Sequence, residues 1–221
     1  MKIIKPSVEM IAMSVLGNFT PETGFQVKQG NIIPEQLIEQ AGRVCYKSED
    51  KITDDSYSNF VDKLCHQYHH KSVSEHSSAT FKIICDRGIM AEITRHRLSS
   101  FSIESTRYCN YGKDKFGKEI SVIMPPDLTQ DQFEAWVEGC EQSEVSYFKM
   151  LDNGATPQIA RSVLPTCLKT EIVMTCNFRS WEHFLELRTA KAAHPQIREI
   201  ALMIQEILVK IAPVVFKVNN L

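Results

Sequence analysis

Segments with strand-like spacing and segments with helical spacing alternate along the whole 221-residue chain, without a change of composition between them. Within 77–86 every second residue from Ala79 to Cys85 is apolar, which is typical of a strand with one buried face. Apolar residues follow helical spacing over 55–70 and again over 88–96. Because the two patterns interleave, we expect one α/β or α+β domain spanning residues 1–221.

Prolines, glycines and capping residues predict the remaining elements. Glycines and prolines gather in 17–34, which we expect to be a loop, and the polar stretch 98–118 should be a long functional loop. Thr129 and Gln132 resemble a capping box that opens a long helix. The other predicted elements are a strand within 3–16, a helix from Pro34 to about Tyr46, the long helix to Asn153, a short helix over 156–165, a strand over 170–178, a helix capped by Ser180, and a last helix from Pro195 to about Pro213.

Overall composition excludes several classes of protein. Hydrophobic residues make up 43% and charged residues 24% of the chain, which is ordinary for a globular protein. A net charge of −2 leaves no overall positive field for nucleic acid, so phosphate binding must be local. No apolar run is long enough to span a membrane. We therefore expect a cytoplasmic protein without a nucleic-acid or membrane partner.

The seven cysteines fit neither a disulfide framework nor a zinc site. Their number is odd, their spacing is wide, and no C-x-x-C pair occurs. Single buried thiols in a reducing compartment explain the pattern better. No cysteine lies beside the histidine and basic residue that would activate it as a nucleophile, and only Cys109, which follows a basic loop, deserves notice.

The densest polar cluster begins at Arg95-His96-Arg97 and continues through several hydroxyl side chains to Arg107. Guanidinium forks match phosphate oxygens, and the cluster is strongly positive in a chain of negative net charge. These residues indicate a pocket for a phosphorylated small molecule. The alternative is a solvated basic turn.

Two further clusters leave several interpretations open. In the cluster His69-His70-Lys71-Ser72 and Glu75-His76, histidines six residues apart with a carboxylate between them could ligate a metal, but no further ligand has a convincing spacing. The same stretch could instead form a helix-end cap through Ser72 and Glu75, or a turn that faces phosphate. The third cluster consists of Arg161, Asn177, Arg179, His183 and Arg188. Its residues are ordinary helix-surface charges unless the fold brings them together. Neither a G-x-G-x-x-G fingerprint nor a P-loop is present.

Four ordered segments resemble the flavin-dependent thymidylate synthases. Arg95-His96-Arg97 followed after seven residues by Ser105 is similar to the R-H-R-x7-S signature of that family. The other matching segments are His70-x-Ser72-x-x-Glu75-His76, Arg161-x-x-Leu164-Pro165, and Asn177-x-Arg179 with Arg188. The resemblance covers about residues 40–200.

This resemblance implies a specific reaction and assembly. Family members convert dUMP to dTMP, take the methylene from 5,10-methylenetetrahydrofolate, and use NADPH with bound FAD rather than a cysteine nucleophile. The implied fold is an α/β domain with a small antiparallel sheet flanked by long helices. It assembles as a homotetramer with sites at subunit interfaces. No metal is implied.

The resemblance also assigns roles to residues, position by position. Arg188 matches the catalytic residue that polarises the uracil ring. The positions that match FAD contacts are His70, Ser72, Arg95, His96, Arg97, Asn177, Arg179 and His183. The positions expected at the dUMP site are Glu92, Arg95, Glu104, Ser105, Thr106, Arg107, Arg161 and Arg188.

Two departures from the family pattern keep other functions open. Residue 102 is Ser where Asn is usual, and residue 103 is Ile where Glu or Gln is usual. Ile103 offers no hydrogen bond to a ligand, so one alternative is a relative that binds flavin and oxidises NADPH without forming dTMP. A non-enzymatic module that binds nucleotide or RNA phosphate is the other alternative, and the negative net charge argues against it.

Overall fold

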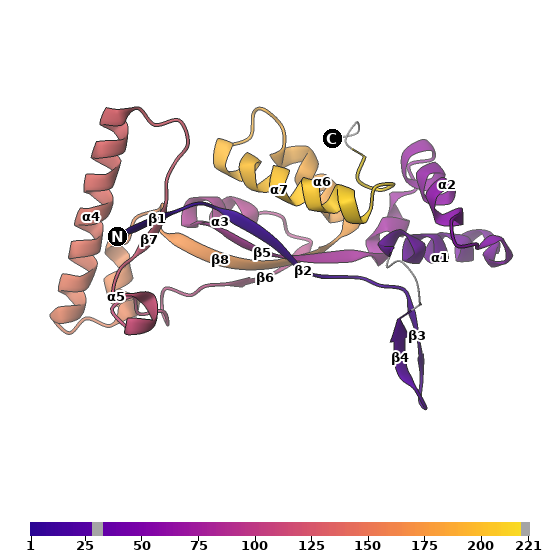
Figure 1. Cartoon of the computed structure of the whole chain (residues 1–221), viewed down its shortest axis with the longest axis horizontal. Helices are drawn as coiled ribbons and strands as arrows, with labels where there is room; N and C mark the ends of the chain where they lie inside the picture. The colour runs from indigo at the N-terminus through magenta and orange to yellow at the C-terminus, as the bar shows by residue number, and fades with distance from the viewer. Residues whose placement is uncertain (28–32, 218–221) are drawn as a thin grey trace.

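The computed structural model describes residues 1–27 and 33–217, and its centre is a four-stranded antiparallel sheet (Figure 1). The strands lie in the order β2 (Ser7–Met13), β5 (Ser78–Asp86), β8 (Lys169–Asn177) and β6 (Ser99–Ile103). β8 pairs with β5 along its full length, from Asn177 opposite Ser78 to Lys169 opposite Asp86. The expected mixed α/β fold with a small antiparallel sheet is confirmed.

Three helices cover one face of this sheet, namely α3 (Arg87–Ile93), α6 (Phe178–Arg188) and α7 (Pro195–Ile211) (Figure 1). Alternate residues of β5 and β8 are buried, and their side chains form the main core with residues of the helices. Trp181 of α6 is fully buried against Phe81, and its indole N–H donates to the carbonyl oxygen of Ala79 at 3.1 Å. This packing fixes α6 on the sheet.

The two ends of the molecule carry smaller units (Figure 1). At one end α1 (Pro34–Tyr46) packs on α2 (Ser56–Asp62), which continues into a π-helical turn at Lys63–Gln67. At the other end α4 (Gln130–Asp152) and α5 (Pro157–Ala160) enclose a second core with Tyr147, Val122 and Leu168. The remaining elements are the parallel pair β1 (Lys2–Ile4) and β7 (Ser121–Ile123), the hairpin of β3 (Gly17–Thr20) and β4 (Gly24–Val27), and 3-10 turns at Glu49–Lys51, Lys71–His76, Asp114–Phe116 and Arg161–Val163.

Most predicted helices are confirmed. Pro34 occupies the first turn of α1, which ends at Tyr46 as expected. Thr129 and Gln132 form both hydrogen bonds of a capping box at the start of α4. The helix predicted from Pro195 is α7.

Four predictions about boundaries are wrong. The loop expected over 17–34 contains the β3–β4 hairpin up to Val27, and 28–32 lie outside the described residues. The opening strand is divided into β1 and β2 on either side of Pro6, and the two pair in different sheets, β1 with β7 and β2 with β5. The polar stretch 98–118 begins with β6, and α6 is capped by Asn177 instead of Ser180.

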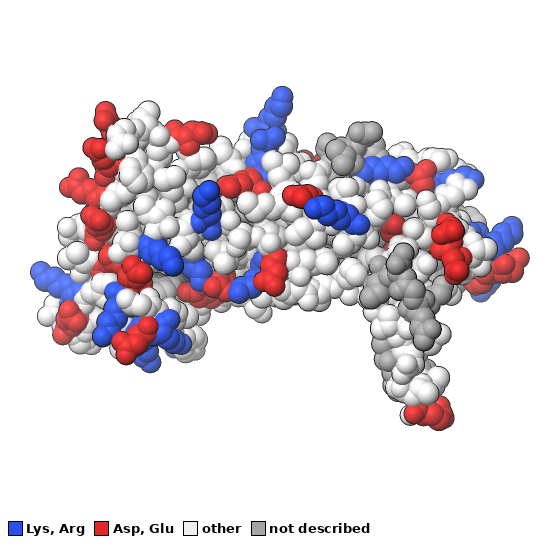
Figure 2. Space-filling model, viewed as in Figure 1, with Lys and Arg blue, Asp and Glu red and all other residues white. Residues whose placement is uncertain are grey.

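The cysteines are free thiols, as expected, but not all are buried. Cys45 is exposed, and Cys109 and Cys167 are partly exposed. The sulfur atoms of Cys140 and Cys167 lie 3.3 Å apart. On the face drawn in Figure 2 acidic and basic side chains are interspersed, and acidic groups line the outer side of α4. Within residues 1–27 and 33–217 no helix is long and apolar enough to cross a membrane.

A buried carboxylate fastens the C-terminal segment to α1. Glu35 is fully buried, and its Oε1 accepts the backbone N–H groups of Val214 at 2.7 Å and Val215 at 3.0 Å. Its second oxygen has no hydrogen-bond partner among the described residues. Burial raises the pKa of Glu35 from its usual 4.5 to about 7.

This raised pKa gives a testable pH dependence of stability. A carboxyl that binds its proton more tightly when folded lowers the free energy of unfolding as pH rises between its unfolded and folded pKa values. Glu35 should therefore cost about 2 to 3 kcal/mol between pH 5 and pH 8. The free energy of unfolding of Glu35→Gln, measured by urea titration at pH 5 and pH 8, should lack this decrease. The Gln side chain keeps an oxygen that can accept the N–H groups of Val214 and Val215. An identical pH dependence in wild type and variant would contradict this assignment.

Candidate active site

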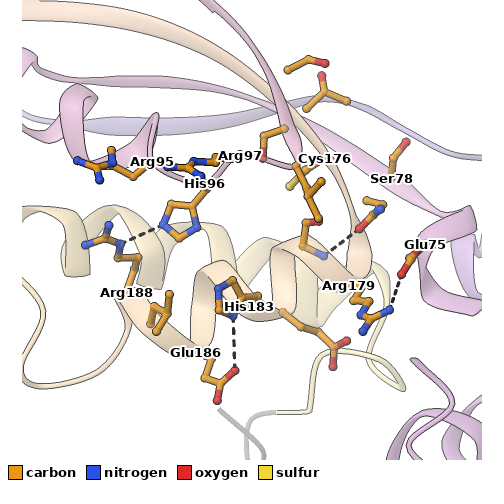
Figure 3. Close-up of a pocket in the computed structure, with 18 of the residues that line it drawn as sticks. Glu75, Ser78, Arg95, His96, Arg97, Cys176, Arg179, His183, Glu186 and Arg188 are labelled. Carbon is orange, nitrogen blue, oxygen red and sulfur yellow. Dashed lines mark hydrogen bonds and ion pairs between the residues drawn. The ribbon is translucent and has the colours of Figure 1, made fainter. Parts of the chain in front are cut away.

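A cavity of about 1250 Å³ opens where α3, α6 and the ends of three strands meet (Figure 3). Its wall contains seven of the residues that the family resemblance assigns to FAD or dUMP. They are Arg95, His96, Arg97, Asn177, Arg179, His183 and Arg188. The fold thus brings the basic cluster and most of the C-terminal cluster to one place, although about 80 residues separate them in the chain.

The strand register explains this convergence. Asn177 at the end of β8 lies opposite Ser78 at the start of β5, and Cys176 lies opposite Ser99 at the start of β6. Because β8 runs antiparallel to both neighbours, the end of β8 meets the beginnings of the other two strands. Asn177 then begins α6, and its Oδ1 accepts the N–H of Ser180 at 2.9 Å. The N-terminus of α6 therefore lies in the cavity wall.

Arg188 is held rigidly at the other end of α6. Its Nη1 lies 2.8 Å from Oε2 of Glu92, and its Nη2 donates to the Glu92 carbonyl oxygen at 3.3 Å. Its Nε lies 3.1 Å from Nε2 of His96, and the two side chains point toward one another in Figure 3. Glu92 does not line the cavity itself but contacts Arg188, which does.

His96 is a neutral histidine in this arrangement. Its ring packs edge-on against Phe184 with 4.8 Å between ring centroids, and it lies near His183. Burial, followed by the charge of Arg188 and by His183, lowers the pKa of His96 from 6.5 to about 4. Because Arg188 can only donate, Nε2 of His96 accepts and the ring proton is on Nδ1.

The other arginines of the cavity differ in their partners. Arg179 pairs with Glu75 at 2.5 Å, on the turn that follows α2. Arg95 and Arg97 are exposed, and within the described residues neither has a carboxylate in ion-pair contact. Together with the N-terminus of α6, these two side chains leave positive charge available for an anionic ligand.

A second group of predicted residues lies away from the cavity. Nη1 of Arg161 lies 3.4 Å from Oγ1 of Thr106, and Nε of Arg107 donates to Oε1 of Gln158 at 3.1 Å. Ser105 belongs to the same turn, where its Oγ accepts the N–H of Arg107. The five residues of β6 separate this turn from Arg97, which corresponds to about 17 Å of extended chain.

Glu104 opens that turn and is engaged within the chain. Its Oε2 lies 2.8 Å from Nζ of Lys169, and its Oε1 accepts the hydroxyl of Tyr111 at 2.9 Å. The neighbouring Ile103 lies opposite Ile172 and packs against the main core. The structure therefore turns Ile103 inward and ties Glu104 to β8.

His70 and Ser72 lie on the exposed turn at Lys71–His76 or just before it, outside the cavity wall. Oη of Tyr46 lies 3.0 Å from Nδ1 of His70. The cap that Ser72 and Glu75 could have formed is not present, since this turn has no side-chain cap and Glu75 binds Arg179. Within the described residues no group of three potential ligands could hold a metal ion.

Two charged wall residues that pair with each other were not identified from the sequence as site residues. Nζ of Lys71 lies 3.1 Å from Oε1 of Glu182, and this glutamate is buried. A signal was available, because Glu182 is a charged residue between Trp181 and Phe184, which both enter the core. A carboxylate in such a position needs a partner.

The fold is that of a mixed α/β protein, and the exposed arginines of its large cavity suit an anionic ligand. The family model described as thymidylate synthase complementing protein matches residues 31–214, and the chain therefore belongs to this family.

Curated relatives carry a consistent name. The chain is 30% identical over 192 residues to the flavin-dependent thymidylate synthase of Geobacter sulfurreducens, an alignment that covers 83% of this chain and 81% of that protein. It is 32% identical over 233 residues to the Corynebacterium glutamicum enzyme of the same name, covering 96% and 89%.

A solved structure shares the fold. The UMP/dUMP methylase PolB from Streptomyces cacaoi, crystallised with 5-Br dUMP, superposes with a TM-score of 0.79 at 24% identity. The match covers 98% of this chain and 96% of that chain. This likeness supports the fold alone.

The neutral state of His96 can be measured directly. NMR titration of histidine-labelled protein should show no titration of His96 between pH 5.5 and 8, because its pKa is about 4. Arg188→Ala removes a neighbouring positive charge and should raise that pKa. A wild-type titration midpoint near 6.5 would contradict the arrangement.

Proposed function

We propose that this chain is a flavin-dependent thymidylate synthase that converts dUMP to dTMP. The observation that carries the proposal is the convergence of Arg95, His96 and Arg97 with Asn177, Arg179 and Arg188 in one cavity, in a chain of this family. Methylenetetrahydrofolate as the methylene donor and NADPH as the reductant belong to the same proposal.

The cavity suits FAD in size and charge. Ligand cavities commonly measure about 300–1,000 Å³, and this one, at about 1250 Å³, has room for a dinucleotide. Arg95 and Arg97 would neutralise the pyrophosphate, with help from the N-terminus of α6. The residues proposed to contact FAD are His70, Ser72, Arg95, His96, Arg97, Asn177, Arg179 and His183. When bound, the flavin would supply the reducing step of the reaction.

The turn that follows β6 and the main cavity would each contribute residues to the recognition of dUMP. Ser105, Thr106, Arg107 and Arg161 would bind the phosphate, since hydroxyl groups and guanidinium forks match its oxygens. Glu104 would serve the same site by anchoring this turn to Lys169. Arg95, Glu92 and Arg188 would lie beside the uracil base of dUMP.

Arg188 would act by stabilising negative charge that develops at N3 and the adjacent carbonyl of the uracil. Glu92 and His96 already fix its guanidinium, so little reorganisation is needed during the reaction. The neutral state of His96 matters here, because an imidazolium would repel Arg188.

The thiol in the cavity wall is unsuited to attack the pyrimidine. Burial raises the pKa of Cys176 to about 12, so the thiol stays protonated at neutral pH. This supports a mechanism without a cysteine nucleophile.

A homotetramer is also part of the proposal. One chain presents its phosphate-binding turn and its main cavity at opposite ends of β6, so a partner copy would complete each site. Large exposed apolar side chains adjoin both clusters: Leu98 is 82% exposed and Tyr108 is 77% exposed. Such groups are typical of protein–protein contacts.

The experiment that tests this function supplies FAD-loaded protein with dUMP, methylenetetrahydrofolate and NADPH. We expect dTMP to form and to depend on flavin. Oxidation of NADPH without dTMP would favour the alternative of a diverged flavoprotein, which the inward-facing Ile103 permits. Failure to bind flavin would contradict both.

The role of Arg188 predicts a separation of binding from catalysis. Arg188→Ala should retain most flavin binding and lose about 10²- to 10³-fold in the rate of dTMP formation, comparable to removal of a donor that stabilises transition-state charge. Arg198→Ala is a suitable control, since Arg198 binds the carbonyl oxygen of Thr189 outside the cavity wall. Normal turnover by Arg188→Ala would contradict the assigned role.

A further inference from the structure

The hydrogen bond between Tyr46 and His70 joins two elements distant in the chain. Tyr46 ends α1, and His70 immediately precedes the turn whose Lys71 and Glu75 enter the cavity wall. Both side chains are exposed, with 52% of Tyr46 accessible. The contact therefore orients an exposed histidine next to Lys71, which lies in the cavity wall.

The backbone before His70 has an unusual conformation. The π-helical turn at Lys63–Gln67 ends just before it, and His69 adopts a left-handed conformation with φ of 56°. The N–H of His70 then donates to the carbonyl oxygen of Leu64 at 2.8 Å. Both features are found preferentially at functional sites, where the surrounding structure holds the strained backbone in place.

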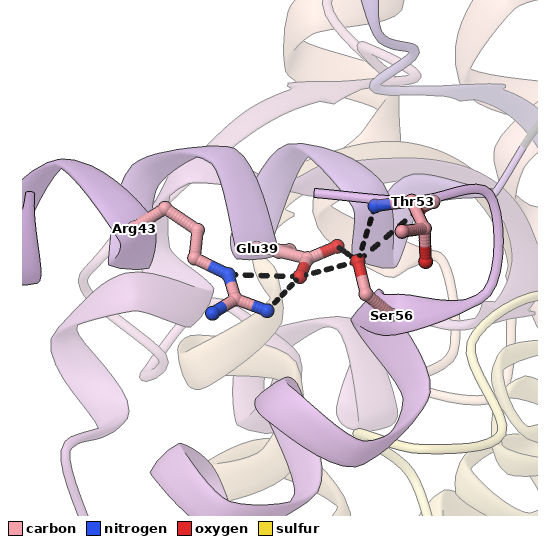
Figure 4. Close-up of polar contacts among 4 residues, drawn as sticks. All are labelled: Glu39, Arg43, Thr53 and Ser56. Carbon is pink, nitrogen blue, oxygen red and sulfur yellow. Dashed lines mark hydrogen bonds and ion pairs between the residues drawn. The ribbon is translucent and has the colours of Figure 1, made fainter. Parts of the chain in front are cut away.

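A buried ion pair anchors the helix that carries Tyr46 (Figure 4). Nε and Nη2 of Arg43 donate to Oε1 of Glu39 at 3.0 and 2.8 Å. The hydroxyl of Ser56 donates to the same carboxylate at 2.8 Å, so the start of α2 is fastened to α1.

Aromatic packing extends this anchor to Tyr46. The guanidinium of Arg43 lies 4.0 Å above the ring of Phe60, and Tyr46 meets Phe60 edge-on with 6.3 Å between centroids. Gly42 allows this approach, since a Cβ there would lie 2.7 Å from both Phe60 and Leu64. The Tyr46 ring is thereby restrained on one side.

We propose that Tyr46 is a positioning residue that sets the orientation and tautomer of His70 for the reaction. In this assignment the Tyr46 hydroxyl donates to Nδ1, and the N–H of the ring is at Nε2. His70 therefore presents an N–H donor to the cofactor or nucleotide, whereas His96 uses its Nε2 as an acceptor. This inference rests on the proposed function for the participation of His70.

The test compares two tyrosines beside the same histidine. Tyr46→Phe removes the hydroxyl that binds Nδ1. Tyr68→Phe is the matched control, because the Tyr68 ring lies 6.0 Å from His70 by centroids without a hydrogen bond to it. In protein labelled with ¹⁵N-histidine, the His70 ring signals are assigned by their loss in His70→Ala. They should move in Tyr46→Phe and stay in place in Tyr68→Phe.

Activity gives the second readout. Tyr46→Phe should lower kcat/KM for dTMP formation about 5- to 10-fold, the size expected for one lost orienting hydrogen bond. Tyr68→Phe should change it less than about twofold, and both variants should keep flavin and unfold within about 2 °C of wild type. In a His70→Ala background, Tyr46→Phe should cause no further loss.

Two outcomes would overturn the proposal. One is identical ¹⁵N signals and rates in the two variants. The other is an equal loss of rate when His70 is already absent, which would show that Tyr46 acts elsewhere. If the wild type forms no dTMP, the proposed function fails separately, and the ¹⁵N signals still decide whether Tyr46 orients the ring.

Discussion

The antiparallel pairing of β8 with β5 and β6 is the interaction on which the rest of the structure depends. It brings the end of β8 beside the starts of both neighbours, and Asn177 there begins α6. Burial of Trp181 against Phe81 then fixes the direction of α6 along the sheet. Arg179 and Arg188 are consequently held at two positions along one cavity, and the Arg95–Arg97 segment reaches the same cavity from the strand on the far side of β8.

Charge in this cavity is organised by hydrogen bonds rather than by a basic field over the surface. Arg188 forms an ion pair with Glu92 and a hydrogen bond with the imidazole of His96, which stays uncharged at neutral pH. Arg95 and Arg97 remain available to an anionic ligand. Arg107 and Arg161 form a second group of arginines beyond β6. The placement of these arginines in two separate regions of one chain is the physical reason to propose a site shared between copies.

Local signals in the sequence predicted much of the fold. Thr129 with Gln132, Pro34 and the alternation in 77–86 each act through nearby residues, and each prediction is confirmed. β6 was not predicted, because its outward serines give the stretch a polar composition while Phe101 and Ile103 face the core. The partners of Glu104, Glu92 and His70 could not be predicted either, since each contact joins distant parts of the chain. For the site, the resemblance supplied the residues and the structure supplied their geometry.

The shared site is tested most directly by mixing two inactive variants. Arg188→Ala and Arg107→Ala would be combined in denaturant, refolded together and assayed for dTMP beside each variant refolded alone. If a partner copy contributes the phosphate-binding turn, about a quarter of the sites in a random mixed assembly contain both arginines, and about that share of wild-type activity should return. If both arginines of each site come from one chain, no mixture can rebuild a site, and activity no higher than that of the separate variants would contradict the account.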